Sequence, residues 1–510
     1  DLRKLVTKQC PRSHGANRLW EIAKLYLDNR DISLQFNDYV RDVFFKDSTG
    51  HGLRGPKGVA DEGKPMGRRK RRRKEYAKLQ NLYKKNQSTC IRGILDGEKK
   101  SEVVNPQEFL LSWARIMEAP SNLPPLPRQE DLQPDDNKTP FFPVSSKDIK
   151  RALPALNTAA GPDGFSPGDL RAVPAIVLRV VITLLMLTHR LPVCLRGART
   201  IFVPKKEGAC EPGDFRPISV SSVVVRLYHK ILANRLLGML SLDYKQRAFL
   251  PVDGCGENVQ MLAGAIHEAR HKFRTLHFAT LDVAKAFDSI TLEAILDGLR
   301  RKGVAEEFVT YMEDFYQTAN TVLTFDTVTK MIHPTRGVRQ GDPLSPLLFN
   351  VVLDYWLSTC DNGVAFRSGG LELSAMAFAD DLVIFSTTPR GLQQQLNSLN
   401  NFLSARGLNL NPNKCLSVSL IADAKAKITK VDSSFRFFIA EKEMPAAEVN
   451  TPWRYLGLQF TPLGLAPTSI VAEIKDLLTN LSKAPLKPQQ RLVALRFYLL
   501  PRFFHRLILG

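Results

Sequence analysis

The sequence predicts an α+β protein, and three observations favour that fold class. Apolar residues recur at helical spacing over long runs such as 223–240, which is typical of helices that pack against a core. Shorter apolar segments, such as 278–282 and 382–385, alternate with these runs and have the length of strands. Hydrophobic residues make up 44% of the 510 residues and charged residues 24%, the balance of a folded globular protein. No internal repeat is detectable.

The first third of the chain contains an unbroken run of cations at 68–74. The segment after it spaces Tyr76, Leu79 and Tyr83 along one face of a helix. Because like charges repel one another, the run lies either in solvent or against phosphates. It predicts a basic helix that either contacts RNA or DNA or is a solvated helix with a nuclear-import signal. The candidate nucleic-acid contacts are Arg68, Arg69, Lys70, Arg71, Arg72, Arg73 and Lys74.

Three further segments set the expected organisation. Seven prolines between 119 and 143 exclude a continuous helix and predict a linker or domain boundary. The apolar tract 175–188 is too short to cross a bilayer and contains Arg179, so it predicts a buried helix and no transmembrane segment. The last stretch, 470–509, has amphipathic helical spacing interrupted by prolines, so helices should close the chain.

The charge balance predicts a polyanionic partner. Lys and Arg total 71 against 51 Asp and Glu, a net charge of +20. This field favours nucleic acid over an acidic small molecule, with an anionic membrane surface as the weaker alternative. The seven cysteines lack zinc-site spacing and predict reduced thiols in an intracellular protein. The chain does not begin with Met, so we expect it to come from a longer protein.

Two loops are candidates for contact with a nucleotide. Segment 201–220 places Lys205, Lys206 and Arg216 around a Pro-Gly turn, where cations could clamp a triphosphate or be ordinary surface charges. Segment 336–350, RGVRQGDPLSPLLFN, opens with two glycines and continues as an apolar helix. Glycines allow close approach of a ligand to the backbone, although a loop with a proline-marked helix start explains the same pattern.

Carboxylates at two strand ends are the candidate metal ligands. A short apolar strand ends at Asp282, and AFADDLVIFS at 377–386 predicts a hairpin with Asp380 and Asp381 at its tip, pointing to different sides. Each acid taken alone could be a surface turn or a helix cap. Acids anchored between apolar runs repel one another unless a cation neutralises them. Nucleotidyl transfer would need a sheet that brings Asp282 beside Asp380 so that they share two divalent ions.

Seven segments, in order, resemble the successive motifs of reverse transcriptases. They are TAAGPDGF, FVPKKEG with PGDFRPIS, LDVAKAFDSI, RGVRQGDPLSPLLFN, AFADDLVIF, GLNLNPNKC and YLGLQF, and they run from about residue 157 toward the C-terminus. The GPDG and AFADD forms and the closing helical segment look most like non-LTR retrotransposons, in particular the R-two (R2) clade that inserts into ribosomal RNA genes. Lys285 departs from the retroviral pattern, in which an acid stands at this position.

The resemblance implies a right-hand polymerase fold. The expected parts are a basic, mainly helical, RNA-binding N-terminal extension over 1–139, fingers over 140–260, a palm with the catalytic site over 261–462, and the start of a helical thumb over 463–510. It also implies two Mg²⁺ ions, with Mn²⁺ able to replace them, held by Asp282, Asp380, Asp381 and the backbone carbonyl of Val283.

The resemblance assigns further roles residue by residue. Phe287 matches the bulky residue that rejects a ribose 2′-hydroxyl. The other implied nucleotide contacts are Lys205, Arg216, Gln340, Gly341 and Lys414, of which Lys414 would lie near the leaving pyrophosphate as a charge stabiliser or proton donor. The implied primer grip is Tyr455, Leu456 and Gly457.

The expected function is RNA-directed DNA polymerisation in the nucleus by target-primed reverse transcription. The expected partners are element RNA as template, the nicked DNA of a ribosomal RNA gene as primer, and deoxynucleoside triphosphates, without a membrane and with no particular oligomeric state implied. No zinc-finger, Myb-like or endonuclease pattern is visible, so only the polymerising half of the process is supported. The alternatives are a group II intron-type maturase and a catalytically silent RNA-binding scaffold.

Overall fold

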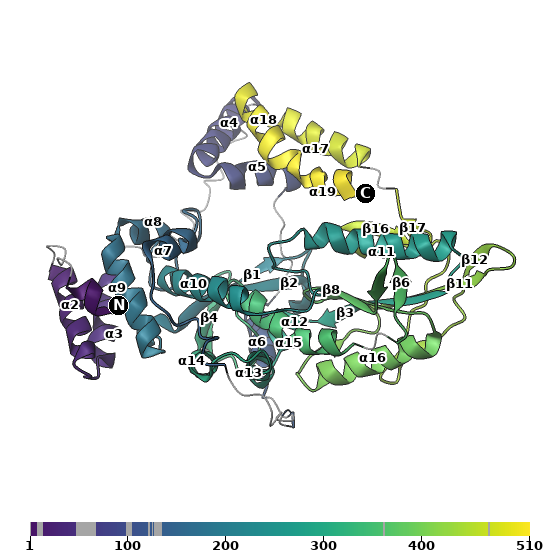
Figure 1. The fold of residues 1–510 in the computed structure, drawn as a ribbon. Coiled ribbons are helices and arrows are strands. Elements are labelled where there is room, and N and C mark those ends of the chain that lie inside the picture. The colour runs from purple at the N-terminus through teal and green to yellow at the C-terminus, as the bar shows by residue number, and fades with distance from the viewer. Residues whose placement is uncertain are drawn as a thin grey trace.

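The computed structural model places two sheets side by side and covers them with helices (Figure 1). It describes residues 2–7, 14–46, 68–97, 105–120, 123–124, 126, 135–360, 363–467 and 470–509. Of the expected linker at 119–143, residues 121–122, 125 and 127–134 lie outside the described residues. No helix in the described ranges is both long enough and apolar enough to span a bilayer.

A bundle of helices forms one end of the molecule. Helix α9 (Ala175–Thr188) has the bounds that its apolar run predicts, and nine of its residues are buried. It packs against α1 (Leu2–Val6), α2 (His14–Leu27) and α7 (Ser146–Ala152) (Figure 1). The bundle also contains α3 (Ser33–Phe44), which contacts α2, and α8 (Pro167–Ala172) and α10 (Val223–Met239), which contact each other.

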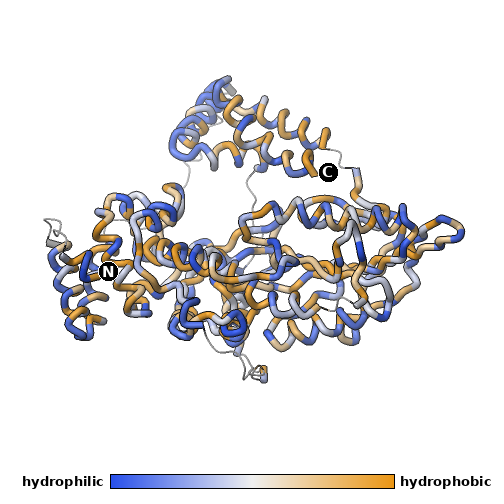
Figure 2. The backbone as a smooth tube through the Cα atoms, in the orientation of Figure 1, coloured by the Kyte–Doolittle hydropathy of each residue, from blue (hydrophilic) through white to orange (hydrophobic). Residues whose placement is uncertain are grey.

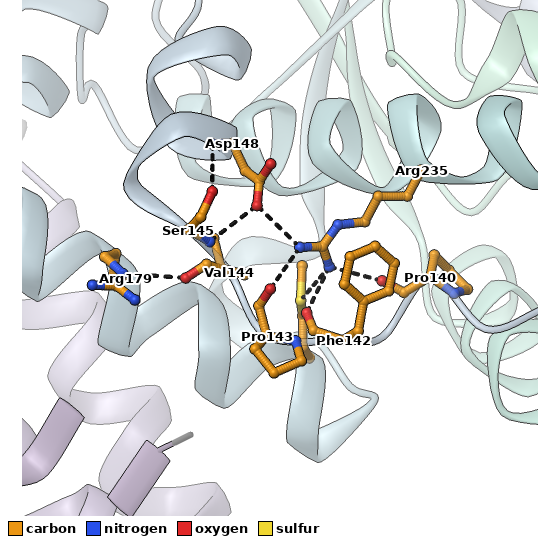
Figure 3. Close-up of polar contacts among 9 residues, drawn as sticks. Pro140, Phe142, Pro143, Val144, Ser145, Asp148, Arg179 and Arg235 are labelled. Carbon is orange, nitrogen blue, oxygen red and sulfur yellow. Dashed lines mark hydrogen bonds and ion pairs between the residues drawn. The ribbon is translucent and has the colours of Figure 1, made fainter. Parts of the chain in front are cut away.

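Arg235 of α10 fixes the path of the chain where it leaves the proline-rich stretch. Its guanidinium donates hydrogen bonds to the carbonyls of Pro140, Phe142 and Pro143 at 2.7 to 3.0 Å (Figure 3). It also pairs with Asp148 at 3.3 Å and lies 3.6 Å from the centroid of the Phe142 ring. One buried cation thus satisfies the carbonyls of a segment whose prolines cannot form regular structure.

The first sheet has the order β2-β1-β4-β5. Its strands are β1 (Gly197–Pro204), β2 (Phe215–Ser221), β4 (Asn320–Phe325) and β5 (Val328–Ile332), and β1 is parallel to β4 but antiparallel to β2. Helix α6 (Pro106–Met117) covers one face, where Phe109 packs among the rings of Phe202, Phe215 and Phe325. Helices α13 (Leu292–Arg301) and α14 (Glu306–Gln317) precede β4.

The second sheet carries the candidate site. Its order is β12-β11-β3-β9-β8, with β10 also paired to β3. The strands are β3 (Leu276–Ala284), β8 (Ala375–Phe378), β9 (Asp381–Ser386), β10 (Asn409–Leu410), β11 (Leu416–Asp423) and β12 (Ile428–Val431). Alternate residues of β3 enter different cores, since Leu281 packs in the core that includes α15 (Ser345–Thr359) and α16 (Pro389–Ser404), and Phe278 packs in the core that includes α11 (Gly254–His271).

Smaller hairpins border this sheet. Strands β6 (Phe366–Ser368) and β7 (Leu371–Leu373) pair with each other, as do β13 (Phe437–Ile439) and β14 (Lys442–Met444). Strands β15 (Trp453–Tyr455), β16 (Leu458–Thr461) and β17 (Gly464–Leu465) form a three-stranded sheet. The short helix α12 (Ala286–Ser289) follows β3 directly.

The basic helix does not form a unit with the rest of the N-terminal third. Helices α4 (Arg68–Lys85) and α5 (Gln87–Asp96) share a separate apolar core with α17 (Val471–Lys483), α18 (Pro488–Ala494), the π-helical turn η4 (Leu495–Leu499) and α19 (Pro501–Leu509). Arg502 forms an ion pair with Asp96 across this contact. Within the expected extension over 1–139, the described helices pack in three places: on the helical bundle, on the C-terminal helices and on the first sheet (Figure 1).

Candidate active site

The strand ends predicted to carry carboxylates do meet. Strands β8 and β9 form a hairpin whose register pairs Phe378 with Asp381, which leaves Ala379 and Asp380 as a two-residue turn. Strand β9 also pairs with β3, and Asp381 lies opposite Asp282. Residues separated by about a hundred positions in sequence thus share one edge of the sheet, and Asp381 is the first strand residue rather than part of the turn.

The three carboxylates repel one another. The pKa of Asp380 is raised, first because the surrounding protein excludes water and then because of the negative charge of Asp282. The pKa of Asp381 is raised to about 6 by the same restriction of water, followed by the charges of Asp380 and Asp282. Such a cluster is stabilised by a cation. The hard oxygen donors therefore fit a divalent metal ion.

The described side chains do not by themselves complete a metal site. Within the described ranges, no group of three or more His, Cys, Asp or Glu side chains is placed to hold an ion. Mg²⁺ characteristically takes one or two carboxylates and completes its shell with water and substrate phosphates, so it does not require a third protein side chain. The backbone N–H of Asp282 contacts Cys415 Sγ and its carbonyl accepts from Asn411, so the carbonyl of Val283 points the opposite way, toward the β9 side.

Cations from two loops border the carboxylates. Lys205 and Arg216 lie on the β1–β2 hairpin, and their charges act to lower the pKa of Asp380, although less than burial raises it. Burial and then the charge of Arg216 lower the pKa of Lys205, whose Nζ donates to the carbonyl of Gly213 at 2.9 Å. Lys414 Nζ lies 3.9 Å from an oxygen of Asp282, and both side chains are exposed. Lys206 instead pairs with Asp214 at 2.8 Å.

The predicted gate residue Phe287 lies on α12, which packs against the loop that carries Gln340 and Gly341. The Phe287 ring of α12 stacks on Phe349, with centroids 4.6 Å apart and planes at 16°. Gln340 Nε2 donates to Asp288 Oδ1 at 2.8 Å. The backbone of Gly341 has φ +111°, and a Cβ there would lie 2.7 Å from the carbonyl oxygen of Ser219, so glycine is required for this loop to approach β2.

Asp288 is a site residue that the sequence reasoning did not single out. It is 8% exposed, and burial raises its pKa to about 6, while Gln340 and the nearby lysines oppose the shift. Its only early signal is that it lies within the LDVAKAFDSI motif. Because a buried carboxylate is favoured in its neutral form, ionised Asp288 destabilises the fold above its pKa.

Asp288→Asn should therefore stabilise the protein at alkaline pH. The pKa of Asp288 in the folded protein, about 6, exceeds its ordinary value of 3.8. The loss of folding stability caused by the ionised carboxylate is therefore complete above pH 6 and decreases as the pH falls through 6 toward 4. The expected gain is about 1 to 3 kcal/mol at pH 8 and less at pH 5, measured by denaturant unfolding in EDTA. An equal gain at both pH values, or a loss at pH 8, would contradict this origin.

The predicted primer-grip residues form a tight hairpin turn. Leu456 and Gly457 both have positive φ, +44° and +89°, between β15 and β16. His505 Nε2 of α19 lies 2.8 Å from the Leu456 carbonyl oxygen, which ties this turn to the C-terminal helices. The Tyr455 side chain is only 4% exposed, so it can influence a primer only through the position of its neighbours.

A second buried network supports the Gln340 loop. His229 Nδ1 lies 2.6 Å from Asp342 Oδ2, and His229 Nε2 lies 2.6 Å from Tyr311 Oη. The histidine and tyrosine had no signal in the sequence, because their meeting depends on the packing of α10 against α14. The network fixes Asp342, two residues after Gln340.

The basic run lies apart from the carboxylates. The described cation side chains, Arg69 to Lys74, are exposed on α4, which packs on the C-terminal helices (Figure 1). Figure 2 shows α4 as the most hydrophilic helix of that group. The side chain of Arg68 lies outside the described residues.

Comparison with known proteins gives one family and a group of relatives. Residues 203–460 match the family described as reverse transcriptase (RNA-dependent DNA polymerase). The Pol polyprotein of the type-2 retrotransposable element R2DM of Drosophila melanogaster is 37% identical, over 100% of this chain and 48% of that protein. The Pol polyprotein of the type-1 retrotransposable element R2 of Nasonia vitripennis is 36% identical, over 86% of this chain and 42% of that protein.

A third relative and one solved structure complete the comparison. The R2 Pol polyprotein of Bradysia coprophila is 32% identical, over 98% of this chain and 57% of that protein. The chain thus spans about half the length of the curated relatives it matches. An apo telomerase structure from Candida Tropicalis aligns with a TM-score of 0.36 and 11% identity over 61% of this chain and 59% of that one, a likeness too distant to carry an argument.

Proposed function

The chain belongs to the reverse transcriptase family, and we propose that it copies the RNA of an R2-type non-LTR retrotransposon into cDNA from the 3′-hydroxyl of a nicked target DNA. The observation that carries the proposal is the meeting of Asp282, Asp380 and Asp381 at one edge of a sheet. The chain has the right-hand polymerase fold of that family. The R2 relatives favour this reading over a group II intron-type maturase.

The proposed parts of the hand follow the sheets. The β1–β2 hairpin and the helical bundle are the fingers, and the sheet of β3, β8 and β9 is the palm. Strands β4 and β5 join the sheet of the fingers although they fall in the 261–462 segment. Helices α17 to α19 are the proposed start of the thumb, which α4 and α5 extend.

Each side chain of the site has a proposed task. Asp282, Asp380, Asp381 and the Val283 carbonyl would hold two Mg²⁺ ions, or Mn²⁺ in their place, which would supply Lewis-acid activation of the primer hydroxyl and neutralise the triphosphate. Lys205 and Arg216 bind the triphosphate. Lys414, exposed beside Asp282, stabilises or protonates the leaving pyrophosphate.

Primer extension tests the proposed function. The purified chain is given Mg²⁺, deoxynucleotides and a DNA primer annealed to RNA, with the same primer annealed to nothing as the control. Template-dependent cDNA is expected, and its absence would overturn the proposal. A second arm offers a pre-nicked ribosomal RNA gene fragment with element RNA or with intron RNA, and a preference for intron RNA would favour the maturase.

The basic helix α4 is the proposed RNA-binding surface, and we place the protein in the nucleus, where the target DNA lies. Seven cations begin this helix, and its apolar residues Leu79 and Tyr83 pack against the core shared with the C-terminal helices. The cations are therefore held on a folded support. Binding through phosphates would be strong at low salt and largely independent of sequence.

Replacing Arg71, Arg72 and Arg73 with glutamine should weaken RNA binding and flatten its salt dependence. Each lost phosphate contact lowers the slope of log K against log salt by about 0.7 to 0.9. In the matched control, glutamine replaces Lys425, Lys427 and Lys430, three exposed lysines of the β11–β12 hairpin. This variant loses the same amount of positive charge. Equal losses in the two variants would show that net charge, not α4, determines binding.

A further inference from the structure

Two buried amide side chains hold the turn that carries Asp380. Gln246, in the segment between α10 and α11, is 1% exposed, and its Oε1 accepts hydrogen bonds from the N–H of Ala379 and of Ala248, each at 3.0 Å. Asn258 of α11 is fully buried, and its Nδ2 donates to the carbonyl of Ala377 at 3.1 Å. Both amides therefore bind backbone within three residues of Asp380.

The backbone around Gln246 reinforces the same contact. Ala377 donates its N–H to the carbonyl of Lys245 at 2.8 Å, and its own carbonyl accepts from the N–H of Arg247 at 3.1 Å. Strand β8 is the last strand of its sheet, so segment 245–247 pairs with an edge that would otherwise be open. The hairpin is thereby fixed on the side away from β9.

The turn needs this support because its conformation is unusual. Ala379 has φ +56°, a left-handed conformation that residues other than glycine rarely adopt. Gln246 Nε2 and Asn258 Oδ1 have no hydrogen-bond partner in the described part of the chain. Buried polar atoms without partners are destabilising, so each such atom in a folded protein needs a reason.

Asn258 extends the contact to the primer-grip hairpin. Its Nδ2 also lies 3.4 Å from the hydroxyl of Tyr455, whose ring is buried at the end of β15. The next residue, Leu456, bonds through its carbonyl to His505 of α19. The β8–β9 hairpin is thus joined to the C-terminal helices through Asn258, the hydroxyl of Tyr455, and the hydrogen bond between Leu456 and His505.

We propose that Gln246 and Asn258 are positioning residues that hold the Ala379–Asp380 turn in its reactive conformation, with Asn258 coupling that turn to the primer-grip hairpin through Tyr455. Neither amide touches substrate, and both act through the direction in which Asp380 presents its carboxylate. The inference rests on the proposed polymerase function. A displacement of reacting groups by about 1 Å can slow an enzymatic step a hundredfold, so modest loosening of the turn should be measurable.

Gln246→Met tests the first contact, because methionine fills similar space without an acceptor for the Ala379 N–H. In single-turnover extension on primed RNA template, the burst rate should fall about tenfold to a hundredfold, while the burst amplitude and the primer-template Kd stay unchanged. Hydrogen exchange of the peptide covering 375–386 should quicken in metal-free protein. A structural defect alone would lower the amplitude and leave the rate of the remaining active molecules unchanged.

Tyr455→Phe tests the coupling and folds more readily, since it removes a single hydroxyl. We expect a burst rate several-fold lower with an unchanged primer Kd, whereas direct contact between Tyr455 and primer would raise the Kd. Tyr228→Phe is the matched control, because Tyr228 is also fully buried and its hydroxyl bonds only the Leu185 carbonyl among the described residues. It should leave the burst rate unchanged.

The outcomes separate the inference from the function on which it rests. Burst rates equal to that of the unaltered chain in both Gln246→Met and Tyr455→Phe would overturn the inference. If Gln246→Met yields no active protein, the inference is tested by Tyr455→Phe alone, and an unchanged burst rate in that variant would overturn it. An unaltered chain that extends no primer would overturn the proposed function, and the inference with it.

Discussion

Asp380→Asn is expected to reduce primer extension on an RNA template by at least about a thousandfold, which corresponds to about 4 kcal/mol of lost transition-state stabilisation. Asparagine keeps the size of the side chain and removes the charge that would hold a divalent ion. The same change should not lower the melting temperature in EDTA, because it relieves repulsion between Asp380 and its neighbours Asp282 and Asp381. Extension assays and thermal unfolding measure the two effects.

The matched control is Asp423→Asn. Asp423 ends β11 in an exposed hairpin, where its carboxylate accepts hydrogen bonds from the N–H groups of Lys425 and Ala426 that an amide oxygen can also accept. Activity should be unchanged. Extension by Asp380→Asn at the rate of the unaltered chain would exclude a metal-binding role for this carboxylate and with it the proposed mechanism.

Much of the site could be predicted because its chemistry is local in sequence. Asp282 and Asp380 each follow an apolar run of strand length. Because both runs are expected to be buried, the two acids are expected at the strand ends. Shared metal binding would require a sheet that brings the two strands together, and the pairing of Asp282 with Asp381 shows such a sheet. Helix α9 was predictable for a similar reason, since its apolar run has no polar face.

The assembly of the N-terminal third could not be predicted in the same way. An apolar stripe on 76–83 shows that one face of a helix is covered, but not by what. Its partners lie about 400 residues later, on α17 to α19. Phe109 poses the same problem, because the aromatic cluster it completes comes from three strands of the first sheet.

The supporting polar residues escaped prediction because their roles exist only in three dimensions. Gln246 and Asn258 are uncharged amides within ordinary segments, and their meaning comes from the backbone groups of Ala377 and Ala379 that they bind. Asp288 stood in a recognised motif, yet its partner Gln340 lies 52 positions away. Spacing and composition give no direct information about such contacts.

Phe287→Ala is expected to weaken discrimination against ribonucleotides by roughly tenfold to a hundredfold. The Phe287 ring cannot easily turn aside, because it stacks on Phe349 and meets the ring of Phe249 edge-on with centroids 6.3 Å apart. To admit a 2′-hydroxyl, the Phe287 ring would have to move and lose these ring contacts, so the steric clash with the hydroxyl persists. The ratio of kcat/KM for deoxynucleotide to that for ribonucleotide, measured at a single templated position, reports the loss.

The bulk of the residue, not its aromatic character, should determine this selectivity. Phe287→Tyr keeps the ring and its stacking on Phe349, so it should preserve discrimination, whereas Phe287→Ala should gain ribonucleotide incorporation with little change in kcat for deoxynucleotides. Phe249→Ala removes the edge contact from a residue that is 52% exposed and should have a smaller effect than Phe287→Ala. If Phe287→Ala rejects ribonucleotides as strongly as the unaltered chain, the ring is not the gate.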